Sequence, residues 1–245
     1  MGRRGRGAMI RAPEPGFSMV SLFTCFHFSR KVESSFMKKC FLDYEILLPP
    51  KKIDYEHWDK AEATAYLEWF ASNIPDRSCY LLVKCFQKKK TVLDCIASPA
   101  VLVDIWRWFL KHAGIEDKPK ETYQKQLEKA HPFGEAFVSQ KQFDIKTEFI
   151  IRDIVMLVSA MFLSLGPSLN LVIEDKPDRY VFKNHPVIAG FVDTSYNPPF
   201  PTVFEPVHMV RIQALKKIKG LEKDTDLLLL YQKWESLIPL SQPTH

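Results

Sequence analysis

The sequence predicts an α+β protein that is mostly helical, with about six to seven helices around one central buried helix and a single small antiparallel sheet. Residues 147–165 form the longest apolar run, and their apolar side chains recur at helical spacing. Several other segments repeat apolar residues at i, i+3 and i+4 between capping residues. By contrast, residues 169–192 contain short runs rich in β-branched and aromatic residues, which are typical of strands.

The central helix, residues 147–165, is apolar on every face, which predicts burial on all sides. Thr147 is suited to cap its start, and Gly166 followed by a proline is suited to end it. Within this helix, the longest stretch without a charged residue runs from Ile154 to Leu165 and is only 12 residues long. A membrane span needs ~20 apolar residues. The segment therefore predicts a core helix, and we expect no membrane association.

Two charged residues, Arg152 and Asp153, stand side by side in this apolar helix. An unpaired charge is costly to bury, so each residue needs a partner or contact with water. One interpretation is a structural ion pair or a solvated first turn. The other is that the two residues form the charged wall of a binding pocket.

Four helices are expected before the central one: 54–74, 76–87, 98–113 and 119–130. Pro75 separates the first two, because proline lacks an N–H and disrupts a helix interior. Ser98 is a capping residue followed by proline, and Gly114 is suited to the position after the helix. Residues 131–146 are expected to form a loop, within a polar connecting segment over 116–146.

After the central helix we expect strands at 169–173, 179–182 and 187–192, joined in one antiparallel sheet. Asn197 to Pro201 contains three prolines and predicts a rigid, extended loop. Two further helices are expected at 206–219, with Gly220 as its stop, and at 224–237.

The charge distribution argues against nucleic-acid binding by most of the chain. The net charge is +5, and residues 1–36 hold six basic against two acidic residues, a net of +4. The other 209 residues therefore carry about +1, too little for general phosphate neutralisation. The five cysteines include no C-x-x-C pair, which disfavours a disulfide framework or a zinc cluster and is typical of cytoplasmic proteins.

Residues 1–36 differ from the rest of the chain. They begin with a low-complexity arginine and glycine run and continue into an apolar stretch, a pattern shared with signal and transit peptides. We interpret them as a disordered or non-native extension and expect the functional chain to start at Met37. Residues 37–245 are then one globular domain.

Metal and cofactor motifs are weak. Glu-x-x-His spacing, which occurs in di-iron helical proteins, is found at Glu128/His131 and Glu205/His208. In the first pair the histidine precedes a proline, and in the second the glutamate does, so neither pair sits within a regular helix. Phosphate-binding glycine loops and the nucleophile elbow are also missing from the sequence. We predict no metal and no cofactor.

The best candidate site lies where the last expected strand meets the proline-rich loop. Its candidate binding residues are Arg152, Asp153, Asp193, Tyr196, Asn197, Phe200, Glu205 and His208. Among them, Asp193, Glu205 and His208 are the candidate catalytic residues, because carboxylates and histidine perform acid–base chemistry. The alternative is a structural connection, since Asp and Asn are common turn residues and Glu205 is placed to cap the next helix.

Several stretches carry a resemblance: Glu148 to Asp153, Gly190 to Asp193, Asn197 to Pro201 and Glu205 to Met209. Through them the chain, over about Tyr44 to Trp234, resembles a family of bacterial proteins with no assigned activity. The resemblance implies no catalytic residue. A long helix followed by a small sheet is also similar to cytosolic immunity proteins of bacterial toxin systems, an analogy of architecture alone.

Three functions remain open. The first is a non-catalytic module that binds another protein, of inhibitor or immunity type. The second is a hydrolase or transferase that uses Asp193, Glu205 and His208 around a pocket that Arg152 helps to line. The third is nucleic-acid binding through the arginines of residues 1–36.

Overall fold

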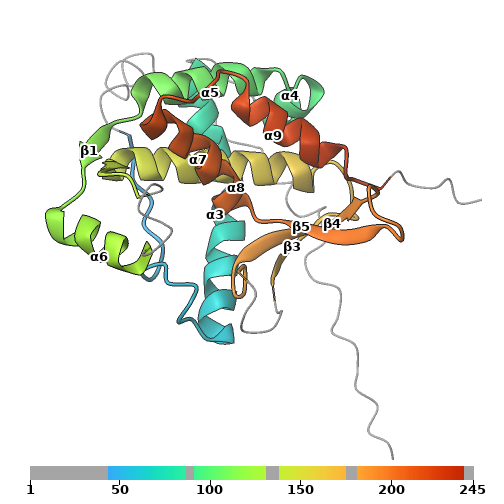
Figure 1. The fold of residues 1–245 in the computed structure, drawn as a ribbon. Helices are drawn as coiled ribbons and strands as arrows, with labels where there is room; N and C mark the ends of the chain where they lie inside the picture. The colour runs from blue at the N-terminus through green and yellow to red at the C-terminus, as the bar shows by residue number, and fades with distance from the viewer. Residues whose placement is uncertain (1–43, 87–90, 131–137, 175–180, 240–245) are drawn as a thin grey trace, which may run out of the picture.

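The computed structural model describes residues 44–86, 91–130, 138–174 and 181–239 (Figure 1). The expectations for residues 1–36 and for a start at Met37 lie outside the described residues. The described helices are α3 (Lys60–Phe86), α4 (Val92–Ala97), α5 (Val101–His112), α6 (Lys120–Ala130), α7 (Ile145–Leu163), α8 (Pro206–Lys219) and α9 (Asp226–Glu235). The strands are β1 (Ile115–Asp117), β2 (Lys141–Phe143), β3 (Asn170–Ile173), β4 (Pro186–Asp193) and β5 (Phe200–Phe204). The mostly helical α+β class is confirmed.

Helix α7 lies at the centre of the molecule, and α3 and α8 pack directly on it (Figure 1). Most of its side chains are buried, which confirms the prediction from its apolar pattern. The predicted ends were wrong. Asp144, and not Thr147, caps the helix, by accepting a hydrogen bond from the Thr147 backbone N–H at 2.7 Å. The helix ends at Leu163 with Ser164 as its cap, so Gly166 does not occupy that position.

Helix α3 runs without a break through Pro75, so the prediction of two separate helices was wrong. The carbonyls near the proline receive side-chain donors: Asn73 Nδ2 donates to Trp69 O at 2.7 Å, and Ser78 Oγ donates to Ile74 O at 2.6 Å. Both halves of α3 also carry residues buried in the common core. These donors do not reach the Ala71 carbonyl, which loses its helical donor at Pro75, so it is packing in the core that outweighs the local cost of the proline.

The segment predicted as a polar connection, 116–146, contains structure of its own. Strands β1 and β2 pair antiparallel, with Ile115 opposite Phe143, and α6 lies between them in sequence. Helix α6 agrees with the helix expected at 119–130, and none of its residues is buried. The described residues therefore contain two small sheets, where the sequence predicted one.

The larger sheet has the order β3–β4–β5 and is antiparallel throughout. Its third strand is β5, which begins within the stretch predicted as a rigid loop. The expected strand at 179–182 was misplaced, because its described part lies in a turn over 181–184. Gly190 adopts φ +109° beside an irregularity in the β4–β5 register, and an added Cβ would lie 2.2 Å from the Ser168 carbonyl oxygen. Only glycine fits there.

An aromatic cluster fixes the sheet to the helices. The Phe162 ring of α7 contacts the rings of Phe191 and Phe204 at 5.4 and 5.0 Å between centroids, and it stacks on Tyr231 of α9 at 4.9 Å. Helix α8 ends as predicted, with Gly220 in the left-handed conformation. Within the described residues, none of the helices combines the length and apolar character needed to span a bilayer.

Candidate functional site

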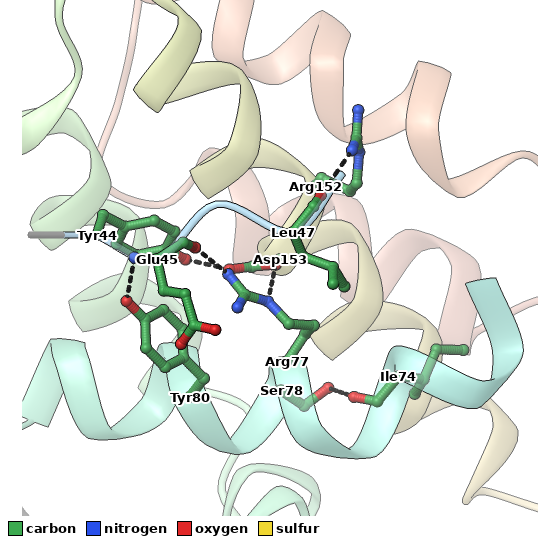
Figure 2. Close-up of polar contacts among 9 residues, drawn as sticks. All are labelled: Tyr44, Glu45, Leu47, Ile74, Arg77, Ser78, Tyr80, Arg152 and Asp153. Atoms are coloured by element: carbon green, nitrogen blue, oxygen red, sulfur yellow. Dashed lines mark hydrogen bonds and ion pairs between the residues drawn. The ribbon is translucent and has the colours of Figure 1, made fainter. Parts of the chain in front are cut away.

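Asp153 of α7 forms a buried ion pair with Arg77 of α3 (Figure 2). Arg77 Nε donates to Asp153 Oδ1 at 2.9 Å, and Arg77 Nη2 donates to Oδ2 at 2.6 Å. The two side chains are only 7% and 4% exposed. The bidentate geometry satisfies both carboxylate oxygens and joins the two central helices of the core.

Burial has a clear electrostatic effect on this pair. It raises the pKa of Asp153 above its ordinary value, against the opposing influence of the hydrogen bonds from Arg77 and Tyr44. Burial, followed by the nearby charge of Asp153, also raises the pKa of the Tyr44 hydroxyl. Tyr44 therefore stays protonated at neutral pH and donates its hydroxyl hydrogen to Asp153.

The same cluster holds residues 44–48, an extended segment that precedes α3. The Glu45 backbone N–H donates to Tyr80 Oη at 2.5 Å, and the Glu45 carbonyl accepts from Arg77 Nη2 at 2.8 Å. Arg152 Nη1 donates to the Leu47 carbonyl at 3.3 Å (Figure 2). Arg152 thus contacts the 44–48 segment, and its guanidinium also lies near the rings of Trp69 and Phe149.

The turn between β4 and β5 carries four of the predicted site residues. Asp193 Oδ1 accepts hydrogen bonds from the Ser195 N–H at 2.9 Å and from Ser195 Oγ at 2.6 Å. These bonds hold the pKa of Asp193 below its ordinary value. Tyr196 and Phe200 are 61% and 58% exposed, their ring centroids 6.1 Å apart, and Asn197 is exposed between them.

Glu205 is fully buried and uses both carboxylate oxygens within the fold. One oxygen caps α8 by accepting from the His208 backbone N–H, and the other lies 3.0 Å from His185 Nδ1. The His208 side chain is exposed and contacts the Phe182 ring at 5.4 Å. The histidine paired with Glu205 is therefore His185, and Glu205 caps α8 as the structural alternative expected.

The sequence interpretation missed His185 because it missed the pairing of β4 with β5. Ile188 lies opposite Phe204, which brings the start of β4 beside the end of β5. The ring of Tyr55 then packs on His185 at 3.9 Å. Residues 200–204 would have to be predicted as a strand and paired antiparallel with 187–192. That pairing would have placed His185 beside Glu205.

The predicted catalytic trio does not converge. Asp193 lies opposite Phe200 at the turn, whereas Glu205 follows the far end of β5. Five residues of extended strand separate the two ends by roughly 17 Å. In the part of the chain that the structure describes, no group of three or more His, Cys, Asp or Glu residues could hold a metal ion.

A groove of about 260 Å³ lies between the 50–51 region and the start of α3, against Trp58 and Tyr66. None of the predicted site residues lines it. Comparisons of the chain with models of protein families, with curated proteins and with solved structures found no significant match. The resemblance to a bacterial family stays a prediction.

Proposed function

We propose that the protein is a non-catalytic module that binds another protein, and that the hairpin tip, residues 193–200 between β4 and β5, makes the contact. The observation that carries this proposal is the exposed pair of aromatic side chains, Tyr196 and Phe200. Large aromatic side chains are enriched at protein interfaces, where their burial supplies much of the binding energy.

The base of the hairpin supports this role because it is anchored in the core. Phe191 of β4 and Phe204 of β5 are buried, and both contact the Trp234 ring, at 5.1 and 5.0 Å between centroids. The tip also contains Pro198 and Pro199, whose fixed φ angles restrict the loop. A loop that is already ordered loses less conformational entropy on binding.

The partner's complementary feature is an apolar pocket that can enclose the two rings. Asp193 stabilises this arrangement, since its Oδ1 closes the turn through Ser195. The separation of Asp193 from Glu205 along β5 favours binding over acid–base catalysis at this place.

The test is affinity capture of a specific protein with the full chain as bait. The Tyr196→Ala/Phe200→Ala variant removes both rings. The matched control is Leu229→Ala, which shortens an exposed apolar side chain on α9, outside the hairpin. We expect one protein to be retained by the wild type and by the control, and lost from the tip variant. Equal retention by the tip variant would contradict the proposed contact.

A further inference from the structure

Residues 44–48 form no helix or strand, yet three side chains of α3 and α7 bind their backbone (Figure 2). Tyr80 accepts from the Glu45 N–H, and Arg77 donates to the Glu45 carbonyl. Arg152 donates to the carbonyl of Leu47, two residues further along the segment. Contacts to backbone atoms do not depend on which side chains the bound segment carries.

The residues that bind the segment also contact other residues of α3 and α7. Arg77 is fixed by its two hydrogen bonds to Asp153, and its guanidinium lies over the Tyr80 ring at 4.3 Å from the centroid. Arg152 lies over the Phe149 ring at 4.9 Å. We call Arg77, Tyr80, Arg152 and Asp153 the α3–α7 site. Its geometry is set by contacts within and between the two helices, so it is preorganised for an extended segment.

One side chain of the segment is bound specifically. The Tyr44 hydroxyl donates to Asp153, and its ring meets the Tyr80 ring edge to face at 5.1 Å between centroids. Two neighbouring apolar side chains are largely exposed, Ile46 at 44% and Leu48 at 68%, and Leu47 between them is half-buried. The segment is therefore attached through its backbone and one tyrosine, and it buries little other apolar surface.

We propose that the α3–α7 site is a binding site for an extended, tyrosine-bearing peptide segment, and that it accepts residues 44–48 from a second copy of this chain as it accepts its own. Every copy carries a segment that fits the site. Exchange between copies breaks and remakes the same four hydrogen bonds and the same ring contact, so the local segment is favoured only by its high effective concentration. The connection to α3 includes Pro49 and Pro50, bends at residues 50–51 and turns at 55–57 before the helix begins.

The first test uses the full chain with Tyr44→Ala, whose own segment lacks its anchor. The probe is a fluorescent, N-acetylated peptide of residues 44–52, and binding is followed by anisotropy. We expect saturable binding that is at least about tenfold tighter to the variant than to the wild type, whose site is filled. A peptide with Ile46→Ala should bind equally well, because that side chain is largely exposed. A peptide with Tyr44→Ala should lose at least about tenfold in affinity, which corresponds to the tyrosine contacts.

The second test identifies the occupant. Tagged Tyr44→Ala chain is mixed with untagged wild type, and we expect co-retention that excess 44–52 peptide abolishes. A folded Tyr44→Ala chain that does not bind the peptide, that binds all three peptides alike, or that retains no wild-type chain overturns the proposal. Should Tyr44→Ala fail to fold, Tyr44→Phe serves instead, since it removes only the hydroxyl bond to Asp153.

The hairpin variant Tyr196→Ala/Phe200→Ala should pair with tagged Tyr44→Ala as the wild type does, which separates this proposal from the hairpin contact.

Discussion

The ion pair between α3 and α7 and the hairpin tip place their side chains in opposite environments. In the buried pair, Arg77 and Asp153 are almost inaccessible, and each is satisfied by hydrogen bonds. At the tip, Tyr196 and Phe200 leave their rings mostly in water. A charge inside an apolar run must find a partner in the fold, because its burial is costly. A solvent-exposed aromatic ring is not buried by the fold, so it is available for contact with another molecule.

The largest expected effect is that of Asp153→Ala, which leaves the buried Arg77 without its partner. Removal of one member of a buried pair costs about 3–5 kcal/mol of unfolding free energy. Urea unfolding followed by circular dichroism measures it. The matched control is Asp193→Ala at the hairpin turn, where we expect a loss below about 1 kcal/mol. Similar losses for the two aspartates would remove the distinction between the regions.

Glu205→Ala should come next, with a loss of about 2 kcal/mol, because it removes the α8 cap and the partner of His185. His208→Ala should change the unfolding free energy by no more than about 0.5 kcal/mol, since only the backbone of His208 serves the cap. Thermal or urea unfolding of both variants checks this. A loss of unfolding free energy for His208→Ala that exceeds that for Glu205→Ala would contradict the assignment of His185 as the partner of Glu205.

Tyr44→Phe should cost about 1.5 kcal/mol, a typical value for one hydrogen bond to a charged group. The ring contact with Tyr80 remains in this variant. Because Asp153 keeps both bonds from Arg77, the effect should stay well below that of Asp153→Ala. The measurement is urea unfolding under identical conditions, and an unchanged midpoint would mean that the hydroxyl bond to Asp153 contributes nothing to stability.

The smallest effect on folding is expected for Tyr196→Ala/Phe200→Ala. Exposed substitutions away from the core usually change stability by no more than about 0.5 kcal/mol each. The unfolding midpoint should therefore stay near that of the wild type while binding to the partner protein is lost. A large fall in the midpoint would assign the two rings to the fold of the hairpin and weaken the case for a contact surface.

A helix could be predicted from the sequence where its position follows from local features alone, such as the spacing of apolar residues or a glycine at its end. The all-round apolar character of α7 and the left-handed Gly220 after α8 are local properties that sequence carries directly. Pro75 shows the limit of local rules, because the contacts of α3 with α7 that offset its cost lie outside any propensity scale.

The candidate site was harder to predict because it depends on pairings distant in sequence. Arg77 and Asp153 are 76 residues apart, and nothing in the sequence joins them. Glu205 was recognised as important, but its partner His185 follows from the register of a strand whose proline made it look like a loop. The aromatic residues Tyr196 and Phe200 were found because a rigid proline-rich turn is a local feature.

Residue-resolved amide hydrogen exchange of the unmodified chain tests the contrast between the two regions most directly. The account predicts that the Glu45 amide, which donates to Tyr80 beside the buried ion pair, exchanges far more slowly than the exposed Tyr196 amide at the hairpin tip. A Glu45 amide that exchanges as fast as that of Tyr196 would contradict it, because residues 44–48 would then not be held on the α3–α7 site.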